Sequence, residues 1–191
     1  METTFTAEPL STWGLHRDMA KADIECILHH LLHYKTEGSF EPAEWVQGAM
    51  RESTVLRIYN LVEELHYRWR DILEEFMAVS EGNVSTGLKH VVEYVLQSAN
   101  HWGRILTAMG FTVSVCAELV NRSWPRHLIC LIMSDVSTLI HHLAGEFINQ
   151  AGGWSDVLTT HRRSNSRWLK MFATAICGFM SARVCVIVAP L

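Results

Sequence analysis

The sequence has little positive charge and no segment typical of secretion. Lysine and arginine number 16 of 191 residues against 20 acidic residues, and the formal net charge is −4. This balance gives no basic field, so nucleic acid is not expected as a partner. The first 18 residues contain no basic segment followed by an apolar run, so we expect no secretory leader and a location on the cytosolic side.

Cysteines are few and irregularly placed. The chain has 5, an odd number without regular spacing, in apolar surroundings: Cys26, Cys116, Cys130, Cys177 and Cys185. A small secreted domain stabilised by disulfides would have an even, regularly spaced set. The sequence therefore favours a reducing compartment, and its length suits one domain with a core that excludes water.

Alternating apolar and polar runs bounded by turn residues are also missing, whereas apolar residues recur with helical spacing almost throughout. We therefore expect an all-α protein. The expected helices lie at about 18–34, 44–79 (long enough for two helices), 88–99, 101–121 and 125–148, with a short one near 154–161. Breaks are expected at 81–87, at the glycines 152–153 and before Pro42 and Pro125, since proline suits the first turn of a helix.

Two neighbouring helices are unusually apolar. The helix at 101–121, which Asn100 could cap, is apolar almost all round from Ile105 to Val120, and the helix after Pro125 is similar. Helices apolar on every side are enclosed by others. The two therefore predict a central apolar hairpin covered by amphipathic helices.

Gly103 and Arg104 do not suit their place in the first turn of the helix at 101–121. A cation at a helix N-terminus is unfavourable by roughly 0.3–1 kcal/mol, and glycine costs about 1 kcal/mol of helix propensity. Both residues therefore need a reason outside the helix itself.

No motif for catalysis is present. The chain lacks a nucleophile elbow, a phosphate-binding loop and paired carboxylates, so neither an enzyme nor a cofactor is expected. His29 and His33 lie four residues apart, a spacing that suits two zinc ligands, and His141 and His142 could complete a site. We favour solvated helix faces over a metal site, and keep a histidine-rich metal-binding scaffold as the alternative from another class.

Two segments about forty residues apart carry a resemblance to a known family. "HWGR" at 101–104 and "FINQAGGW" at 147–154 resemble the first and second homology motifs of the Bcl-2 family of apoptosis regulators, in which "NWGR" and "WIQENGGW" are typical. The third motif, a leucine followed four residues later by Gly-Asp, is degenerate. Leu56 and Arg57 match it, but Asn60 and Leu61 replace Gly-Asp.

The resemblance implies a Bcl-2-like helical bundle whose surface groove binds the amphipathic third-motif helix of a pro-apoptotic relative. Arg104 would meet the aspartate of the ligand, and Gly103 would let the ligand backbone approach. The ligand groove would contain Tyr67, Trp69, Leu88, Val91, Val95, His101, Gly103, Arg104, Thr107 and Phe111. The residues that pack the motifs together would be Trp102, Gly152, Gly153 and Trp154.

The residue in place of the family asparagine is His101. Because histidine titrates near neutral pH, ligand affinity is predicted to change between about pH 5.5 and 7.5.

The loss of Gly-Asp makes the chain's own third motif a poor ligand, so the resemblance favours an anti-apoptotic member that blocks permeabilisation of the mitochondrial outer membrane. The short segment at 35–42 suits a compact, divergent member such as a viral homologue. Within the family, the alternative is a pro-apoptotic pore former whose apolar hairpin enters the membrane.

The expected organisation is a bundle at 1–160, a basic linker at 161–167 and an apolar tail at 168–191. The tail is a possible membrane anchor, although Arg183 costs about 2.5–3.5 kcal/mol on insertion scales. Packing of the tail on the bundle is the alternative. An anchored protein would lie on the cytoplasmic face of the mitochondrial outer membrane or endoplasmic reticulum, with a cytosolic pool.

Overall fold

The computed structural model describes residues 13–42, 52–66, 70–80, 83–97, 101–154 and 157. Its helices are α1 (Trp13–Lys35), α2 (Glu52–His66), α3 (Arg70–Val79), α4 (Val84–Leu96), α5 (Trp102–Asn121) and α6 (Arg126–Gln150). None of these ranges contains a strand. The all-α prediction is confirmed, including two helices within 44–79. The expected helix near 154–161, the linker and the tail lie outside the described residues.

The predicted break at 81–87 is wrong in its second half, because α4 begins at Val84. Gly87, taken from the sequence as part of a break, is a packing position within the helix. A Cβ at this residue would lie 3.3 Å from Cε2 of Phe76, closer than most Cβ contacts. The missing side chain lets α4 approach the Phe76 ring of α3.

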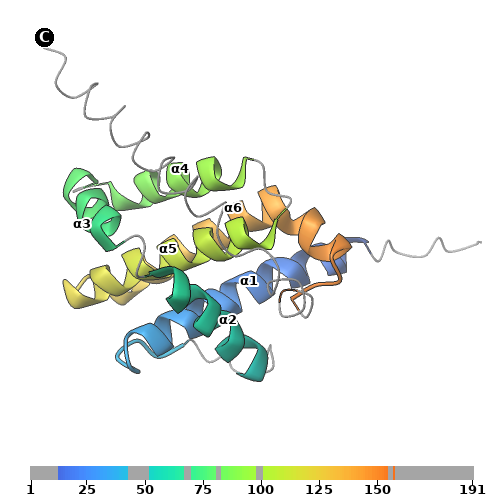
Figure 1. Ribbon diagram of the computed structural model, residues 1–191, viewed down its shortest axis with the longest axis horizontal. Helices are drawn as coiled ribbons and strands as arrows, with labels where there is room; N and C mark the ends of the chain where they lie inside the picture. Colours follow the sequence, from blue (N-terminus) through green and yellow to red (C-terminus); the bar gives the residue numbers. More distant parts are fainter. Residues whose placement is uncertain are drawn as a thin grey trace, which may run out of the picture.

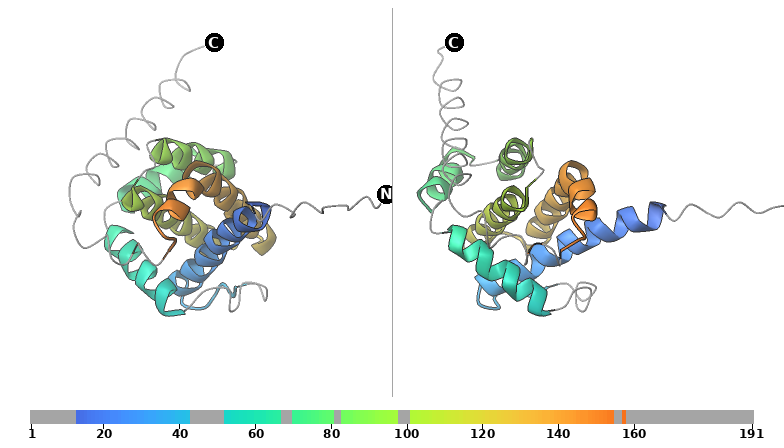
Figure 2. Two further views of the ribbon diagram at one scale, coloured as in Figure 1. Left: turned by 90° about the vertical axis from the view of Figure 1, so that its right-hand side faces the viewer. Right: turned by 45° about the vertical axis from the view of Figure 1, so that its right-hand side comes forward.

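The centre of the bundle is α5. It packs against all five other helices, and almost every residue from Trp102 to Leu119 is buried. In Figure 1, α1 and α2 lie on one side of α5 and α6, and α3 and α4 lie on the other. Figure 2 shows the same order of helices from two further directions. The prediction that α5 is enclosed by other helices is confirmed.

The second helix of the hairpin, α6, is buried along one side only. It packs on α1, α4 and α5. On its outer side Leu131 is 58% exposed, and Thr138 and His142, about two and three turns further along, are also exposed. The prediction that α6 is enclosed like α5 is therefore wrong. The helix is apolar enough to be enclosed, but no described helix covers its outer side.

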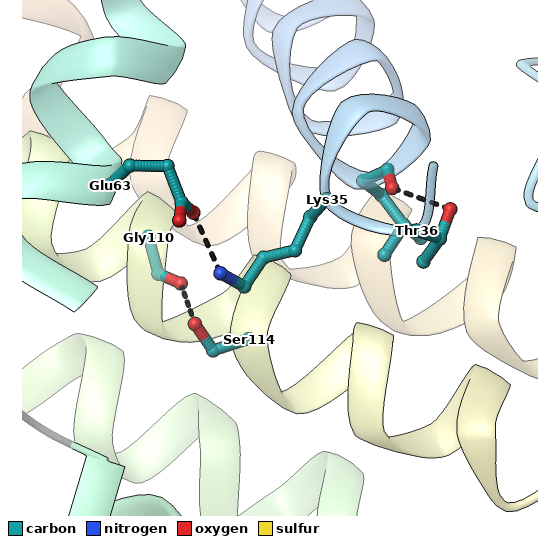
Figure 3. A network of polar contacts seen from close by, with 6 residues as sticks. Lys35, Thr36, Glu63, Gly110 and Ser114 are labelled. Carbon is teal, nitrogen blue, oxygen red and sulfur yellow. Dashed lines mark hydrogen bonds and ion pairs between the residues drawn. The ribbon is translucent and has the colours of Figure 1, made fainter. Parts of the chain in front are cut away.

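A short ion pair joins the first two helices. Lys35 Nζ at the end of α1 lies 2.7 Å from Glu63 Oε1 of α2, and the lysine side chain is only 13% exposed. Figure 3 shows the two side chains pointing toward each other beside α5, where Ser114 donates to the Gly110 carbonyl oxygen. Partial burial weakens screening by solvent, so this pair holds α2 against α1 better than an exposed pair would.

The predicted solvated histidine face on α1 is wrong for His29. This side chain is 2% exposed and lies 6.0 Å from the Phe40 ring, which in turn has the Arg126 guanidinium 5.2 Å above its centroid. Arg126 also donates to the Glu41 carbonyl oxygen. These contacts hold the segment after α1 against the start of α6. Burial above all, then the charges of Arg126 and His30, lowers the pKa of His29 to about 4.

The side chain of His33 forms a hydrogen bond instead. Its Nδ1 lies 3.0 Å from the Phe40 carbonyl oxygen, and since a carbonyl only accepts, Nδ1 carries the proton. Within the described ranges, no group of three or more His, Cys, Asp or Glu side chains could hold a metal ion. The zinc alternative thus has no support from the described histidines.

The lowered pKa of His29 predicts that acid destabilises the protein. Between about pH 6.5 and pH 4 the unfolded chain takes up a proton at this residue and the folded protein does not, so the free energy of unfolding falls as the pH falls. The loss is at most about 3 kcal/mol. Urea titrations at several pH values in this range give the free energy of unfolding. Its slope against pH should be smaller for His29→Gln than for wild type. The control is His127→Gln, because His127 is exposed. An unchanged slope in His29→Gln would contradict the assignment.

Candidate functional site at the junction of α4 and α5

The cap of α5 is His101, not Asn100, so the predicted capping residue is wrong. His101 has an extended backbone, with φ −159° and ψ 126°, and its Nδ1 accepts a hydrogen bond of 3.0 Å from the Gly103 backbone N–H. An N-cap side chain satisfies one of the donors left over at a helix start. An imidazole nitrogen that carries no proton can do so in place of the usual amide or hydroxyl oxygen.

Arg104 has a structural partner that explains its place in the first turn. Its Nη1 donates to the carbonyl oxygen of Val95 over 3.3 Å. Val95 belongs to the last turn of α4, whose carbonyls have no partner within their own helix. The guanidinium is therefore unfavourable at the start of α5 but favourable at the end of α4, because cations stabilise a helix C-terminus.

Arg104 has no carboxylate partner among the described residues. The ion pairs found there join Lys35 to Glu63, Lys89 to Asp135, and Arg122 to Glu118. The side chain of Arg104 is half-buried rather than enclosed. Its charge is thus balanced by a carbonyl dipole and solvent, and it remains able to bind an acid from outside the bundle.

One face of α5 links this arginine to α3. Arg104, Thr107 and Phe111 are spaced three and four residues apart and lie on the same side of the helix. Arg104 reaches the end of α4, and the Phe111 ring meets Phe76 of α3 edge-on, with centroids 5.3 Å apart. This face of α5 is therefore directed toward α3 and α4.

The apolar residues predicted to line a groove are gathered here, but they are buried. Leu88, Val91, Val95, Thr107 and Phe111 are each at most 5% exposed. Gly103 is also buried, and of the predicted groove residues that the structure describes, only His101 and Arg104 reach the surface. Tyr67 and Trp69 lie outside the described residues. A ligand would therefore have to separate α3 or α4 from α5 to reach the apolar side chains.

The two motif segments pack against each other at the far end of the hairpin. The Trp102 ring at the start of α5 lies 5.4 Å from the rings of both Phe147 and Trp154. Gly152 and Gly153 have φ values of +90° and +78°, which favour glycine and turn the chain back after α6. The expected packing of Trp102 against Trp154 is present, and it fixes the start of α5.

The buried stripe of α2 is shifted by one residue from the expected third motif. Leu56 is 46% exposed, whereas Val55, Ile58 and Val62 are at most 1% exposed. Ile58 and Val62 belong to the main hydrophobic core, and the helix packs on α5 and α1. With Val55 in the leucine position, Tyr59 and Asn60 take the places of Gly-Asp.

Two contacts of this site were not predicted. The Val95 carbonyl oxygen is a backbone atom, so no residue type in the sequence indicates its role. Phe76 lies within the helical range expected at 44–79, but only the packing of α3 on α5 shows that its ring meets Phe111.

Comparison with known proteins bears on the same region. The family model described as apoptosis regulator proteins, Bcl-2 family, matches residues 57–154, which is slightly more than half of the chain. No curated protein sequence gives a significant match. The family match includes the α4–α5 junction and both motif segments.

The cap of α5 predicts the effect of substitutions at His101. His101→Ala should lower the free energy of unfolding by roughly 0.5–2 kcal/mol, whereas His101→Asn should keep the cap. Urea denaturation measures both effects, and the exposed His127→Ala is the control. Equal stability of His101→Ala and wild type would exclude the capping role.

Proposed function

Because the chain belongs to the Bcl-2 family of apoptosis regulators, we propose that it is an anti-apoptotic member that binds the third-motif helix of pro-apoptotic relatives. The family assignment supports regulation of apoptosis and interaction with other Bcl-2 family proteins. In the proposed complex, the ligand helix lies between α3 and α4 over α5. Its capture blocks permeabilisation of the mitochondrial outer membrane.

The observation that supports the proposal most directly is the environment of the Arg104 side chain. Its guanidinium is half-buried, positioned by the Val95 carbonyl oxygen, and without a carboxylate partner in the described part of the chain. A carboxylate from a ligand helix would form a charge-assisted, potentially bidentate pair with it. The absence of a side chain at Gly103 lets the ligand backbone come close at the same point.

The apolar anchors of the ligand would replace contacts that α3 now makes. This helix has only 10 residues and packs mainly on α5. Of the two helices beside the proposed ligand site, α3 is therefore displaced more easily than α4. Its displacement would uncover Phe111, which now contacts Phe76, and give access to Val91 and Leu88 of α4. Helices that bind in grooves use apolar residues at such spacings as anchors.

The condition of α2 favours an anti-apoptotic role. Its apolar stripe is already buried, and the Lys35–Glu63 pair holds the helix to α1. To act as a ligand for a relative, α2 would have to leave the bundle. It also lacks the aspartate that a partner arginine requires.

The tail at 168–191 and the basic linker at 161–167 complete the proposal. Their composition suits attachment to the cytoplasmic face of the mitochondrial outer membrane or the endoplasmic reticulum, with a cytosolic pool. Attachment would keep the α4–α5 junction near the membrane on which its ligands act.

A pore-forming member of the same family is the second candidate. Among the described helices, α5 and α6 are long and apolar enough to cross a membrane, although core helices of water-soluble bundles also meet this criterion. The exposed Leu131 on α6 favours this candidate. Release of a dye from liposomes of mitochondrial lipid composition, caused by the activated full chain, would support it over the anti-apoptotic function.

Charge reversal at Arg104 tests the proposed function. Arg104→Glu should weaken the binding of synthetic third-motif peptides by about 30-fold or more, because it leaves the ligand carboxylate opposite a like charge. Calorimetry with the full chain measures the affinities. Arg122→Glu, on the exposed C-terminal end of the same helix, is the control and should bind like wild type. Equal binding by Arg104→Glu and wild type, or no binding by wild type, would refute the proposal.

A further inference from the structure

Thr107 has a buried hydroxyl group that forms no hydrogen bond within the described part of the protein. The residue is 0% exposed, and its Oγ1 has no hydrogen-bond partner among the described residues. The same helix shows the usual alternative. Thr112 Oγ1 donates to the Ala108 carbonyl oxygen over 2.7 Å, and Ser114 Oγ to that of Gly110 over 2.9 Å. The corresponding bond from Thr107 to the Gly103 carbonyl is not formed.

An unused buried hydroxyl calls for a physical reason. Burial without a partner removes the hydrogen bonds with water and returns nothing, so nearly all buried polar side chains are paired. Threonine has two accessible rotamers in a helix, one of which would let Oγ1 bond to the preceding turn. Valine would fill the same space without an unmet donor. Thr107 therefore carries a cost in the free protein that a ligand could relieve.

The position of Thr107 indicates where that ligand would lie. It lies between Arg104 and Phe111 on the face of α5 that is directed toward α4 through Val95 and toward α3 through Phe76. Thr112 lies on another face of the helix. Ser114 lies two turns beyond Thr107 on the same side, but its hydroxyl is bonded to the Gly110 carbonyl oxygen. On this side of α5, the hydroxyl without a partner is therefore the one closest to Arg104.

We propose that Thr107 determines ligand specificity, by hydrogen-bonding a short polar side chain that the ligand helix carries within one turn of its aspartate. The inference rests on the proposed function. Arg104 and Thr107 are three residues apart, a rise of about 4.5 Å along α5, so the two ligand groups must be similarly close. A buried polar group rejects a ligand that leaves it unpaired, and this makes the contact selective.

The test uses the full chain and synthetic third-motif peptides. One peptide has alanine at every non-anchor position within one turn of the aspartate, and the others carry a single serine at each of these positions in turn. For wild type, at least one serine peptide should bind about five- to tenfold more tightly than the alanine peptide. Thr107→Val should lose this preference and bind the serine and alanine peptides with equal affinity.

A second readout separates ligand recognition from a structural role. Because Thr107→Val removes an unmet hydroxyl and keeps the shape, the Tm of the free protein should rise by about 2–4 °C. Thr112→Val is the matched control. It removes a hydroxyl that is already bonded on the same helix, so its Tm should not rise and its serine preference should equal that of wild type.

Each contrary result has a distinct meaning. A Tm lowered by Thr107→Val would show that the hydroxyl is satisfied in the free protein, and this overturns the inference. Equal weakening of serine and alanine peptides, or no serine preference in wild type, overturns it as well. If Arg104→Glu loses binding while Thr107→Val behaves like wild type, the inference fails and the proposed function stands. If wild type binds no peptide, both fail.

Discussion

The hydrogen bond from Arg104 to the Val95 carbonyl oxygen is the contact on which the rest of this site depends. It joins the last turn of α4 to the first turn of α5 and gives a partner to a carbonyl that has none within its own helix. A cation in a first turn is unfavourable for α5 alone. The C-terminus of α4 offsets that cost, so the guanidinium can stay at the surface without an internal acid. The bond also fixes the position from which Arg104 can meet a ligand.

The buried position of α5 gives this junction a rigid support. Contacts with all five other helices hold its axis, and the ring contacts of Trp102 with Phe147 and Trp154 hold its first turn. His101 then satisfies the Gly103 N–H from outside the helix. Because its axis and its first turn are both held, α3 can move away from α5 without displacing Arg104, whose partner Val95 stays in place on α4. The proposed binding requires this arrangement, in which Arg104 is held in place and the neighbouring helix α3 can move.

The sequence predicts the fold better than it predicts the details of the site. The apolar residues of 105–120 indicate a central helix through residue type and spacing alone. The packing of Trp102 against Trp154 is implied by the resemblance that "HWGR" and "FINQAGGW" carry. The Val95 contact could not be predicted, since any residue offers a carbonyl. The one-residue shift from Leu56 to Val55 needs the packing of α2 on α5, and burial of His29 needs Phe40 and Arg126, which are distant in sequence.

Further differences between the expected and the observed structure occur at a glycine and a histidine, because each of these residue types has more than one structural role. Gly87 resembles a helix break in the sequence, yet it provides room for Phe76. His101 occupies a position that suggested a titratable ligand contact, and in the structure it first serves as a helix cap. In both cases the tertiary neighbour decides the role.

The most direct test of the central claim is a charge swap between Arg104 and the ligand. Calorimetry would measure four affinities, for wild type and Arg104→Asp with a third-motif peptide that carries either its aspartate or an arginine at that position. If the guanidinium meets the ligand carboxylate, each single change weakens binding. The swapped pair should then bind at least tenfold more tightly than the two single losses, taken as independent, would give. Strictly additive losses, with no recovery in the swapped pair, would contradict the account.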